Sequence, residues 1–538
     1  MWLVGVAYHL MWTHDSLPLE MPTGSGRTCW SALRHGGGAH RSRLDSPRPP
    51  ALPRAAAGLG CSQATGPPAQ TGPAAIAATG SLTPVLCGAT RQAVVLALCG
   101  KPAQHSGRLA RLGGRSSRAM LSILRNRSFA LIWLGGLVSL TGDWALITGV
   151  PLVVYQLTGS TLALGLTSMA TSLPLLLVGS IAGVFVDRWD RRWTMLVADV
   201  LLGVLLLPLV LVSSTEWLWL LVGVLVLESS IVQFYRPAEG ALVPLLVPES
   251  ELVTANALNG LSMNVARLAG PPLGALLVVL GGLSAVVLVD AASFLLGALT
   301  LLLVRVDLRP ALASSSRAVS AVWREWLDGL RLVRTRPVPR VIFVFLAITG
   351  VGEGIMRTLF VAFATRVLQG GELTYAALLS AQAVGGLVGS LVLGQLGRRV
   401  TPAVLFGVGA CLVGGIDFLI FYSPLVTSQM LVPVGLMVIV GLPVAALLTG
   451  YLTLAQTSVD DAYRGRLLGL FFATTALSGL VGMALASVLG DAIGIIPMLT
   501  LQCMGYVLGG GVVLVALARA RTPVRSVAQD GADLSGSA

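Results

Sequence analysis

The chain has 538 residues, of which 55% are hydrophobic and only 11% are charged. An ordinary soluble protein has about 25% charged residues, so this composition excludes a soluble globular protein and predicts one that crosses a membrane many times. The formal net charge of +12 would suit a nucleic-acid-binding protein, but +9 of it falls in residues 1–119. The apolar remainder is nearly neutral, and we expect no nucleic-acid partner.

Residues 1–119 differ in composition from the rest of the chain. They are rich in Pro, Gly, Ser, Ala and Arg, and their apolar runs are far shorter than the ~20 residues that span a bilayer. We expect this segment to be disordered. At Met120 the sequence changes to a short basic amphipathic lead into an apolar run. We expect native translation to start at Met120, with a regulatory tail as the alternative; mass spectrometry of the native N-terminus distinguishes the two.

Apolar runs of spanning length recur from residue 129 onward, separated by short polar breaks. Six runs, a basic connection and six further runs predict an all-α integral membrane protein with twelve transmembrane helices in two six-helix bundles. The bundles are expected at residues 120–304 and 340–518, the connection at 305–339 and a disordered tail at 519–538. The predicted spans are residues 129–155, 161–186, 193–213, 217–235, 256–281, 284–304, 340–367, 375–396, 402–422, 430–456, 467–489 and 495–518.

Arginine is distributed unevenly over the predicted loops. One side holds the turn at 187–192, Arg236, the connection and Arg464, whereas the opposite loops contain no Arg or Lys, with Arg366 as a nearby exception. Because positively charged loops remain in the cytoplasm, we expect both termini of this multi-pass membrane protein to be cytoplasmic.

The connection contains apolar residues at helical spacing. Val322, Trp326, Leu330 and Val333 recur with Arg between them. This pattern predicts a basic amphipathic helix that lies on the inner leaflet.

The turn after the second predicted span reads Gly-x-x-x-Asp-Arg-x-x-Arg-Arg over residues 183–192. It resembles the loop between helices 2 and 3 of the major facilitator superfamily, whose pattern is Gly-x-Leu-x-Asp-Arg-x-Gly-Arg-Arg/Lys. The resemblance implies the major facilitator fold, with a substrate site between its halves, and places Asp187 near the start of helix 11. A carboxylate at a helix N-terminus is stabilised by ~0.3–1 kcal/mol. We expect Gly183, Asp187, Arg188 and Arg191 to hold the cytoplasmic ends together in the outward-open state; the alternative is that the Arg residues only set topology.

The same turn recurs in the second half of the chain. A shift of 207 residues places Arg398 and Arg399 at the positions of the last two Arg of the turn, with Gly394 in place of the acid and Ser390 in place of the first Gly; chance recurrence in a Gly-rich chain is the alternative. Equal placement in each half predicts two pseudo-symmetric bundles, as expected for transporters built from repeats.

The fifth predicted span contains a second motif, with Gly270, Pro271 and Gly274. It resembles the Gly-x-x-x-Gly-Pro-x-x-Gly-Gly pattern on helix 5 of superfamily antiporters, with Ala at two of the Gly positions. Small residues permit close helix packing, and Pro kinks a helix. The resemblance implies export; a packing face common to any helix bundle is the alternative.

Several charged side chains are predicted at mid-depth, where each costs ~2.5–3.5 kcal/mol on insertion scales and is a functional candidate. Glu353 and Arg357 lie one helical turn apart and can pair, for a structural or a gating role. Arg267 needs an acid, for which Asp143 and Glu228 are available in the same half. The predicted spans contain no His, so proton coupling would use carboxylates: Asp143 first, because the resembled family lines its cavity with helix 1, and Glu228 second.

Three other acids, Asp199, Glu239 and Asp290, are predicted nearer the membrane surfaces, where they would pair locally or cap helices. The sequence does not show which way the side chain of Asp417, on the ninth span, points, so we do not count it among the candidates. Cys411 and Cys503 stand alone in separate apolar runs, so we expect no metal site.

Residues 124–135 and 155–160 resemble bacterial exporters of the macrolide-efflux and enterobactin-exporter type. The resemblance implies a secondary active transporter that exports small amphipathic, drug-like or siderophore-like molecules by proton-coupled alternating access. Each inward-moving proton releases ~2.3 kcal/mol per 100 mV. We expect a monomer in the lipid bilayer, with a small-molecule substrate, no cofactor, no catalytic residues and no enzyme activity. The alternatives are a facilitator that imports a metabolite or flips a lipid, and a transport-inactive sensor or scaffold.

Overall fold

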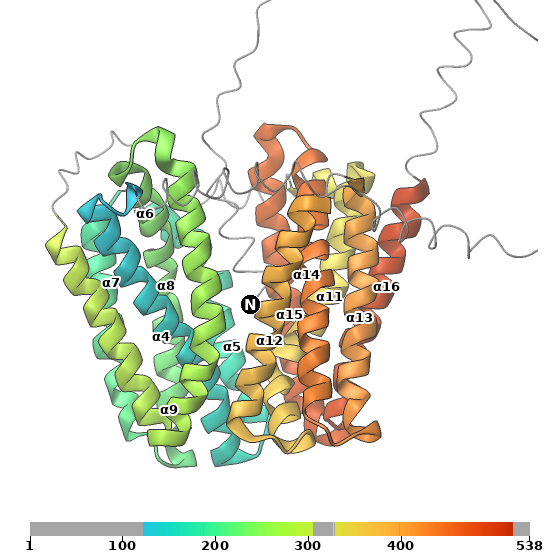
Figure 1. Ribbon diagram of the computed structural model, residues 1–538, viewed down its shortest axis with the longest axis horizontal. Coiled ribbons are helices and arrows are strands. Elements are labelled where there is room, and N and C mark those ends of the chain that lie inside the picture. Colours follow the sequence, from blue (N-terminus) through green and yellow to red (C-terminus); the bar gives the residue numbers. More distant parts are fainter. Residues whose placement is uncertain (1–121, 187, 305–326, 328, 397–398, 520–538) are drawn as a thin grey trace, which may run out of the picture. The chain divides into compact units, whose positions relative to one another are not determined.

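A computed structural model of the chain describes residues 122–186, 188–304, 327, 329–396 and 399–519. Every regular element in these residues is a helix (Figure 1). Ten of the described helices are long and apolar enough to cross a membrane. The prediction of an all-helical membrane protein is therefore confirmed. The segment at 1–119, the tail at 520–538, Asp187 and most of the connection lie outside the described residues.

The first helices of the described chain form what we call the N-terminal helix group. Helix α4 begins after Asn126, whose Oδ1 accepts hydrogen bonds from the N–H groups of Ser128 and Phe129 at 3.1 and 3.3 Å. It ends at Gly159, whose φ of 61° favours glycine. The group consists of α4 (Arg127–Thr158), α5 (Thr161–Leu177), α6 (Gly179–Val186), α7 (Arg191–Leu206), η1 (Leu207–Leu211), η2 (Thr215–Trp217), α8 (Leu218–Leu246), η3 (Glu249–Glu251) and α9 (Leu252–Leu303).

Helix α9 combines two of the predicted spans. Its backbone leaves the helical conformation at Gly281 and Gly282, and Gly282 has a φ of 63°. The break falls at the predicted boundary, so α9 is a first segment at 252–280 and a second segment at 283–303. The second predicted span is instead divided at Val178 into α5 and α6.

The remaining elements form the C-terminal helix group. Helices α11 and α13 each have Pro in the first turn, where the missing N–H costs no hydrogen bond. Of the amphipathic helix predicted in the connection, residues 329–335 are described and helical. The group consists of α11 (Pro337–Ala362), η4 (Phe363–Val367), α12 (Gly371–Leu396), α13 (Pro402–Val426), α14 (Leu431–Thr457), α15 (Asp461–Ile493) and α16 (Ile495–Arg519).

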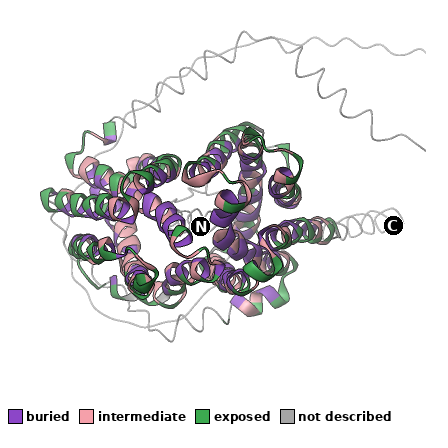
Figure 2. Ribbon diagram, turned by 90° about the horizontal axis from the view of Figure 1, so that it is seen from below, coloured by how far each residue is buried: buried purple, intermediate pink, exposed green. Residues whose placement is uncertain are grey.

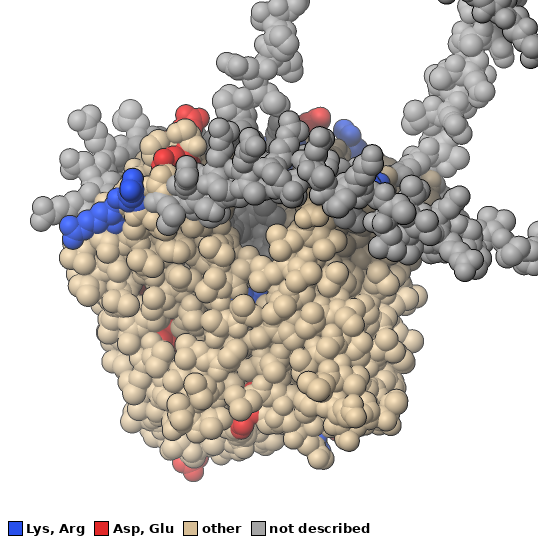
Figure 3. Space-filling model, viewed as in Figure 1, with Lys and Arg blue, Asp and Glu red and all other residues tan. Residues whose placement is uncertain are grey.

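Apolar and aromatic side chains hold each group together. Phe345 and Phe406 are buried and meet edge to face, with ring centroids 4.6 Å apart. Within the groups, α4 packs on α9, and α11 packs on α15. Figure 2 shows buried residues on the inner faces of the helices and exposed residues on their outer faces. On the face shown in Figure 3, the charged side chains lie mostly near the helix ends, as expected for a protein surrounded by lipid.

The two helix groups contact each other chiefly through two pairs of helices, with smaller contacts of α11 with α5 and with α4. Helix α5 packs on α15, and α9 packs on α12. These four helices therefore form the boundary between the groups, and the candidate site lies along it.

Candidate functional site

A cavity of about 330 Å³ lies between the two helix groups. Most of its lining is apolar or aromatic, with side chains such as Trp144, Phe360 and Tyr375. A few charged side chains interrupt this lining, a combination typical of sites that bind small organic molecules. They are Asp143, Glu228, Arg236, Arg267, Glu353, Arg357 and Asp417.

A second cavity of about 360 Å³ adjoins the first. The two share Asp143, Trp144, Arg236 and Arg357 in their walls. The second cavity continues between α4, α8 and α9 as far as Phe129, near the start of α4. The space between the groups thus extends toward the end of the molecule at which α4 begins.

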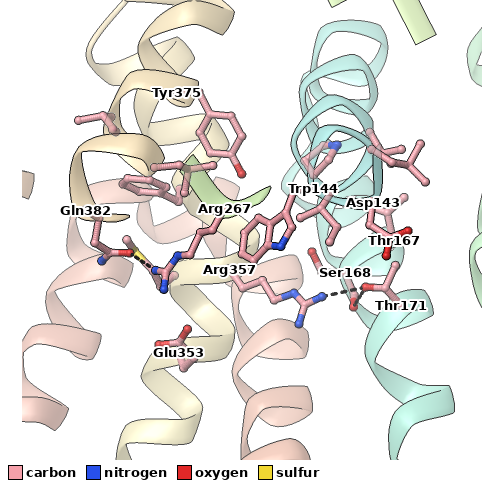
Figure 4. A pocket seen from close by; sticks show the side chains of 18 of the residues that line it. Asp143, Trp144, Thr167, Ser168, Thr171, Arg267, Glu353, Arg357, Tyr375 and Gln382 are labelled. Carbon is pink, nitrogen blue, oxygen red and sulfur yellow. Dashed lines mark hydrogen bonds between the residues drawn. The ribbon is translucent and has the colours of Figure 1, made fainter. Parts of the chain in front are cut away.

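Arg267, on the first segment of α9, reaches across the boundary between the groups. Its Nη2 donates a hydrogen bond of 3.1 Å to Oε1 of Gln382 on α12 (Figure 4). The guanidinium carbon lies 5.9 Å from the centre of the Trp144 ring, within the range of a cation–π contact. We expected an acid in the same half of the chain as the partner of Arg267. Gln382, which accepts this hydrogen bond, and Glu353, which interacts with Arg267 electrostatically, both lie in the other half.

Arg357, on α11, reaches across in the opposite direction. Its Nη2 donates a 3.1 Å hydrogen bond to Oγ1 of Thr171 on α5 (Figure 4). Glu353, one turn earlier on α11, interacts electrostatically with both Arg357 and Arg267 and accepts a hydrogen bond from the Tyr506 hydroxyl at 3.4 Å. The expected pair of Glu353 and Arg357 is thus part of a larger charged set that spans both groups.

Asp143 is the acid that faces both cavities from α4. Its Oδ1 is buried and has no hydrogen-bond partner among the described residues. Arg236 on α8 interacts with it electrostatically. We predicted Arg236 in a surface loop, and this was wrong: α8 continues through Pro237 as far as Leu246, and Arg236 lines the cavity. Glu228 lies two turns earlier on the same helix and lines the first cavity.

Two further acids, Asp199 and Asp290, are completely buried. Both lie inside helices, so the prediction that they cap helices is wrong, and their depth in the membrane stays a prediction. Neither oxygen of Asp199 has a hydrogen-bond partner among the described residues. Asp199 packs against Gly297 and Asp290 against Gly142. The sequence does contain the Gly that packs against each acid. It does not show which helices pack together, so these contacts could not be predicted from it.

The turn at 183–192 is described except for Asp187. A Cβ on Gly183 would meet no heavy atom of the described chain within 4 Å, and Arg188 is exposed. Arg191 is the first residue of α7, which Asp190 caps by accepting a 2.9 Å hydrogen bond from the N–H of Trp193. The proposed contact of Asp187 with helix α15 therefore stays a prediction.

Arg192 has a defined structural role in the same turn. It donates hydrogen bonds to the carbonyl groups of Leu301 and Leu302 at 2.9 and 3.1 Å. Those carbonyls end α9, and a cation is favourable at the C-terminus of a helix. The side chain thus ties the start of α7 to the end of α9.

The motif on the first segment of α9 packs against α4. A Cβ on Gly270 would overlap the Trp144 side chain, and one on Gly274 would overlap the carbonyl oxygen of Ala145. Pro271 is buried, and the segment stays helical through it. The small residues therefore place α9 directly behind the Asp143–Trp144 part of the cavity wall.

One end of the boundary between the groups is closed by hydrogen bonds. The N–H of Thr161 donates to Oδ2 of Asp491, and its hydroxyl donates to the carbonyl of Ser487, both at 3.2 Å. Gln156 also donates to Glu372 at this end. These contacts lie beside the loops that lack Lys and Arg, whereas the cavity extends toward the opposite end.

Residues 132–483 match the family model described as Major Facilitator Superfamily. The chain belongs to this superfamily. It is 29% identical over 417 residues to the multidrug efflux pump Tap of Mycolicibacterium fortuitum, covering 73% of this chain and 96% of the pump. It is 26% identical over 373 residues to macrolide efflux protein A of Streptococcus pyogenes, covering 68% of this chain and 90% of that protein.

Solved transporter structures share the fold. A bacterial homologue of the iron transporter ferroportin, in an inward-facing state, superposes with a TM-score of 0.57 at 18% identity. The match covers 72% of this chain and 98% of that one. The chain is thus a multi-pass membrane protein of a transporter superfamily, with efflux transporters among its relatives.

Proposed function

We propose that the protein exports small amphipathic molecules, drug-like or siderophore-like, across a bacterial plasma membrane by proton-coupled alternating access. The observation that carries this proposal is the cavity between the two helix groups. It is largely apolar, is closed at one end, and holds in its wall an acid, Asp143, whose buried Oδ1 has no hydrogen-bond partner among the described residues. The names of the efflux relatives support the direction of transport.

The proposed architecture has twelve spans in two six-helix bundles. Counting α5 with α6 as one span and the two segments of α9 as two gives six spans in each helix group. With the Arg-bearing loops in the cytoplasm, the end closed by Thr161 and Asp491 is the outer one. In this orientation both termini are cytoplasmic, and the cavity opens inward.

The proposed energy source is the proton gradient, with no cofactor. Asp143 and Glu228 face the cavity, where a carboxyl group can hold either a proton or a cationic group of the cargo. Protons that bind from the outside would displace cargo there, and cargo would displace protons on the inside. Asp187 would hold the cytoplasmic ends together in the outward-open state, through the start of α15.

Transport into everted membrane vesicles tests this proposal. Vesicles that contain the chain should accumulate a fluorescent lipophilic cation when respiration acidifies their interior, and lose it when a protonophore is added. Asp143→Asn should reduce the initial rate at least tenfold, whereas Glu249→Gln, which changes an exposed acid outside the cavity, should not. Accumulation that is insensitive to the protonophore, or equal in the two variants, would contradict the proposal.

A further inference from the structure

One fully buried carboxyl group, that of Asp290, has no part in the scheme above. It lies on the second segment of α9, and none of its surface is exposed. It packs against α4 at Gly142, where a Cβ would overlap Asp290 Oδ1 and come within 3.1 Å of Ser293 Cβ. Gly142 is thus the small residue that admits this carboxyl group. The next residue along α4 is Asp143, which faces the cavity.

In the described part of the chain, the carboxyl group of Asp290 has too few hydrogen-bond donors around it to be stable as an ion. The Ser293 hydroxyl lies 2.8 Å from the carbonyl oxygen of Asp290 and 3.2 Å from its Oδ1. A hydroxyl has one proton to donate, and the shorter contact is with the carbonyl. The contact in which the hydroxyl donates to Oδ1 is therefore the weaker of the two, and it stabilises an ionised carboxyl group only slightly. Oδ2 is buried and has no hydrogen-bond partner among the described residues, which a carboxylate ion in an apolar interior would need.

The charges around Asp290 favour a neutral group as well. Asp143 on α4 and Glu228 on α8 are the charged groups that interact with it electrostatically. Behind them, Asp143 interacts with Asp199 on α7 and with Arg236 and Glu239 on α8. Two carboxylates close together in an apolar interior do not both stay ionised. The proton on Asp290 is therefore linked to the charge at Asp143.

We propose that Asp290 is a proton-binding site behind the cavity wall, and that a cationic cargo bound at Asp143 releases its proton. The positive charge of the cargo offsets the negative charge of Asp143, so ionisation of Asp290 meets less repulsion. Asp290 then loses one proton to water, and the Asp143 carboxylate alone faces the cargo cation. Cargo at Asp143 and the proton on Asp290 thus occupy different sites and compete through electrostatic interaction. This inference rests on the proposed proton-coupled export.

Asp199 provides the matched control. It is equally buried, lies in the same helix group and lines neither cavity. It contacts the second segment of α9 at Gly297, about 10 Å along the helix axis from Asp290 at 1.5 Å per residue. Its replacement removes a buried acid without removing the group beside Gly142.

The test measures proton release from the purified full chain in weakly buffered detergent on addition of tetraphenylphosphonium, a lipophilic cation. Wild type and Asp199→Asn should release about one proton per bound cation. Asp290→Asn should bind the cation within about threefold of wild type and release fewer than a third as many protons. If Asp290→Asn releases as many protons as wild type, the assignment of Asp290 is wrong. If wild type binds the cation and releases none, the proposed coupling itself fails.

Infrared difference spectra between acid and alkaline pH test the proton on Asp290 without any cargo. One component of the C=O stretching band of protonated buried carboxyl groups should be present in wild type and in Asp199→Asn and missing in Asp290→Asn. Asp143→Asn should move the pH at which this band changes. If Asp290→Asn does not purify as a single species, the same spectra are recorded for Asp290→Ser. A band that survives both Asp290 variants unchanged would overturn the proposal.

Discussion

The hydrogen bond between Arg357 and Thr171 joins the two helix groups across the cavity, and Thr171→Val removes its acceptor while keeping the side-chain shape. A hydrogen bond to a charged group contributes about 1.5–3 kcal/mol. Arg357 borders the cavity and is only partly buried, so water can replace some of the lost interaction, and we take about 1.5 kcal/mol, the lower value. Because 1.36 kcal/mol corresponds to a factor of ten, the population of the conformation described here should fall roughly tenfold relative to its alternative.

Spin labels on the two helix groups measure this population. Leu162 on α5 and Ile493 on α15 are 50% and 51% exposed and lie near the closed end. With the six native Cys replaced, the distance distribution between labels at these positions should show a short component that shrinks in Thr171→Val. Thr167→Val is the control, because the Thr167 hydroxyl bonds only to carbonyl groups of its own helix. An unchanged distribution in Thr171→Val, or an equal change in both variants, would refute the reasoning.

Two further predictions concern the packing of the N-terminal helix group. Gly274→Val places a side chain against the backbone of Ala145 and should destabilise the protein by about 1–3 kcal/mol, seen as a lower melting temperature in detergent; Gly260→Val, at a position with open space, should not. Arg192→Gln removes the hydrogen bonds to the carbonyls of Leu301 and Leu302 and should cost about 1 kcal/mol, whereas the exposed Arg188→Gln should melt like wild type. Equal melting temperatures within either pair would contradict the packing described.

Helix positions followed from local sequence, because apolar runs and helix breakers act locally. The break at Gly281 and Gly282 was placed correctly, since Gly282 adopts a φ that favours glycine. Arg236 was misplaced for a related reason: Pro237 looks like the end of a helix, yet α8 continues through it. Proline inside a membrane helix is tolerated where neighbouring groups satisfy the backbone.

The residues that face the cavity could be predicted only in part. Asp143, Glu228 and Arg267 were chosen from their depth, and all three line the cavity. Depth carries no information on the partner across the boundary, so Gln382 and Thr171 could not be found from the sequence. Asp290 was missed because its burial depends on the absence of a side chain at Gly142, on a different helix.

A reversible cross-link at the closed end tests alternating access between the two helix groups most directly. Gln156 and Glu372 form a hydrogen bond there, one from each group. Cys at both positions, in a chain without its native Cys, should form a disulfide under mild oxidation. The account predicts that the cross-linked protein stops accumulating cargo in everted vesicles and recovers when the disulfide is reduced. Undiminished transport by fully cross-linked protein would contradict it.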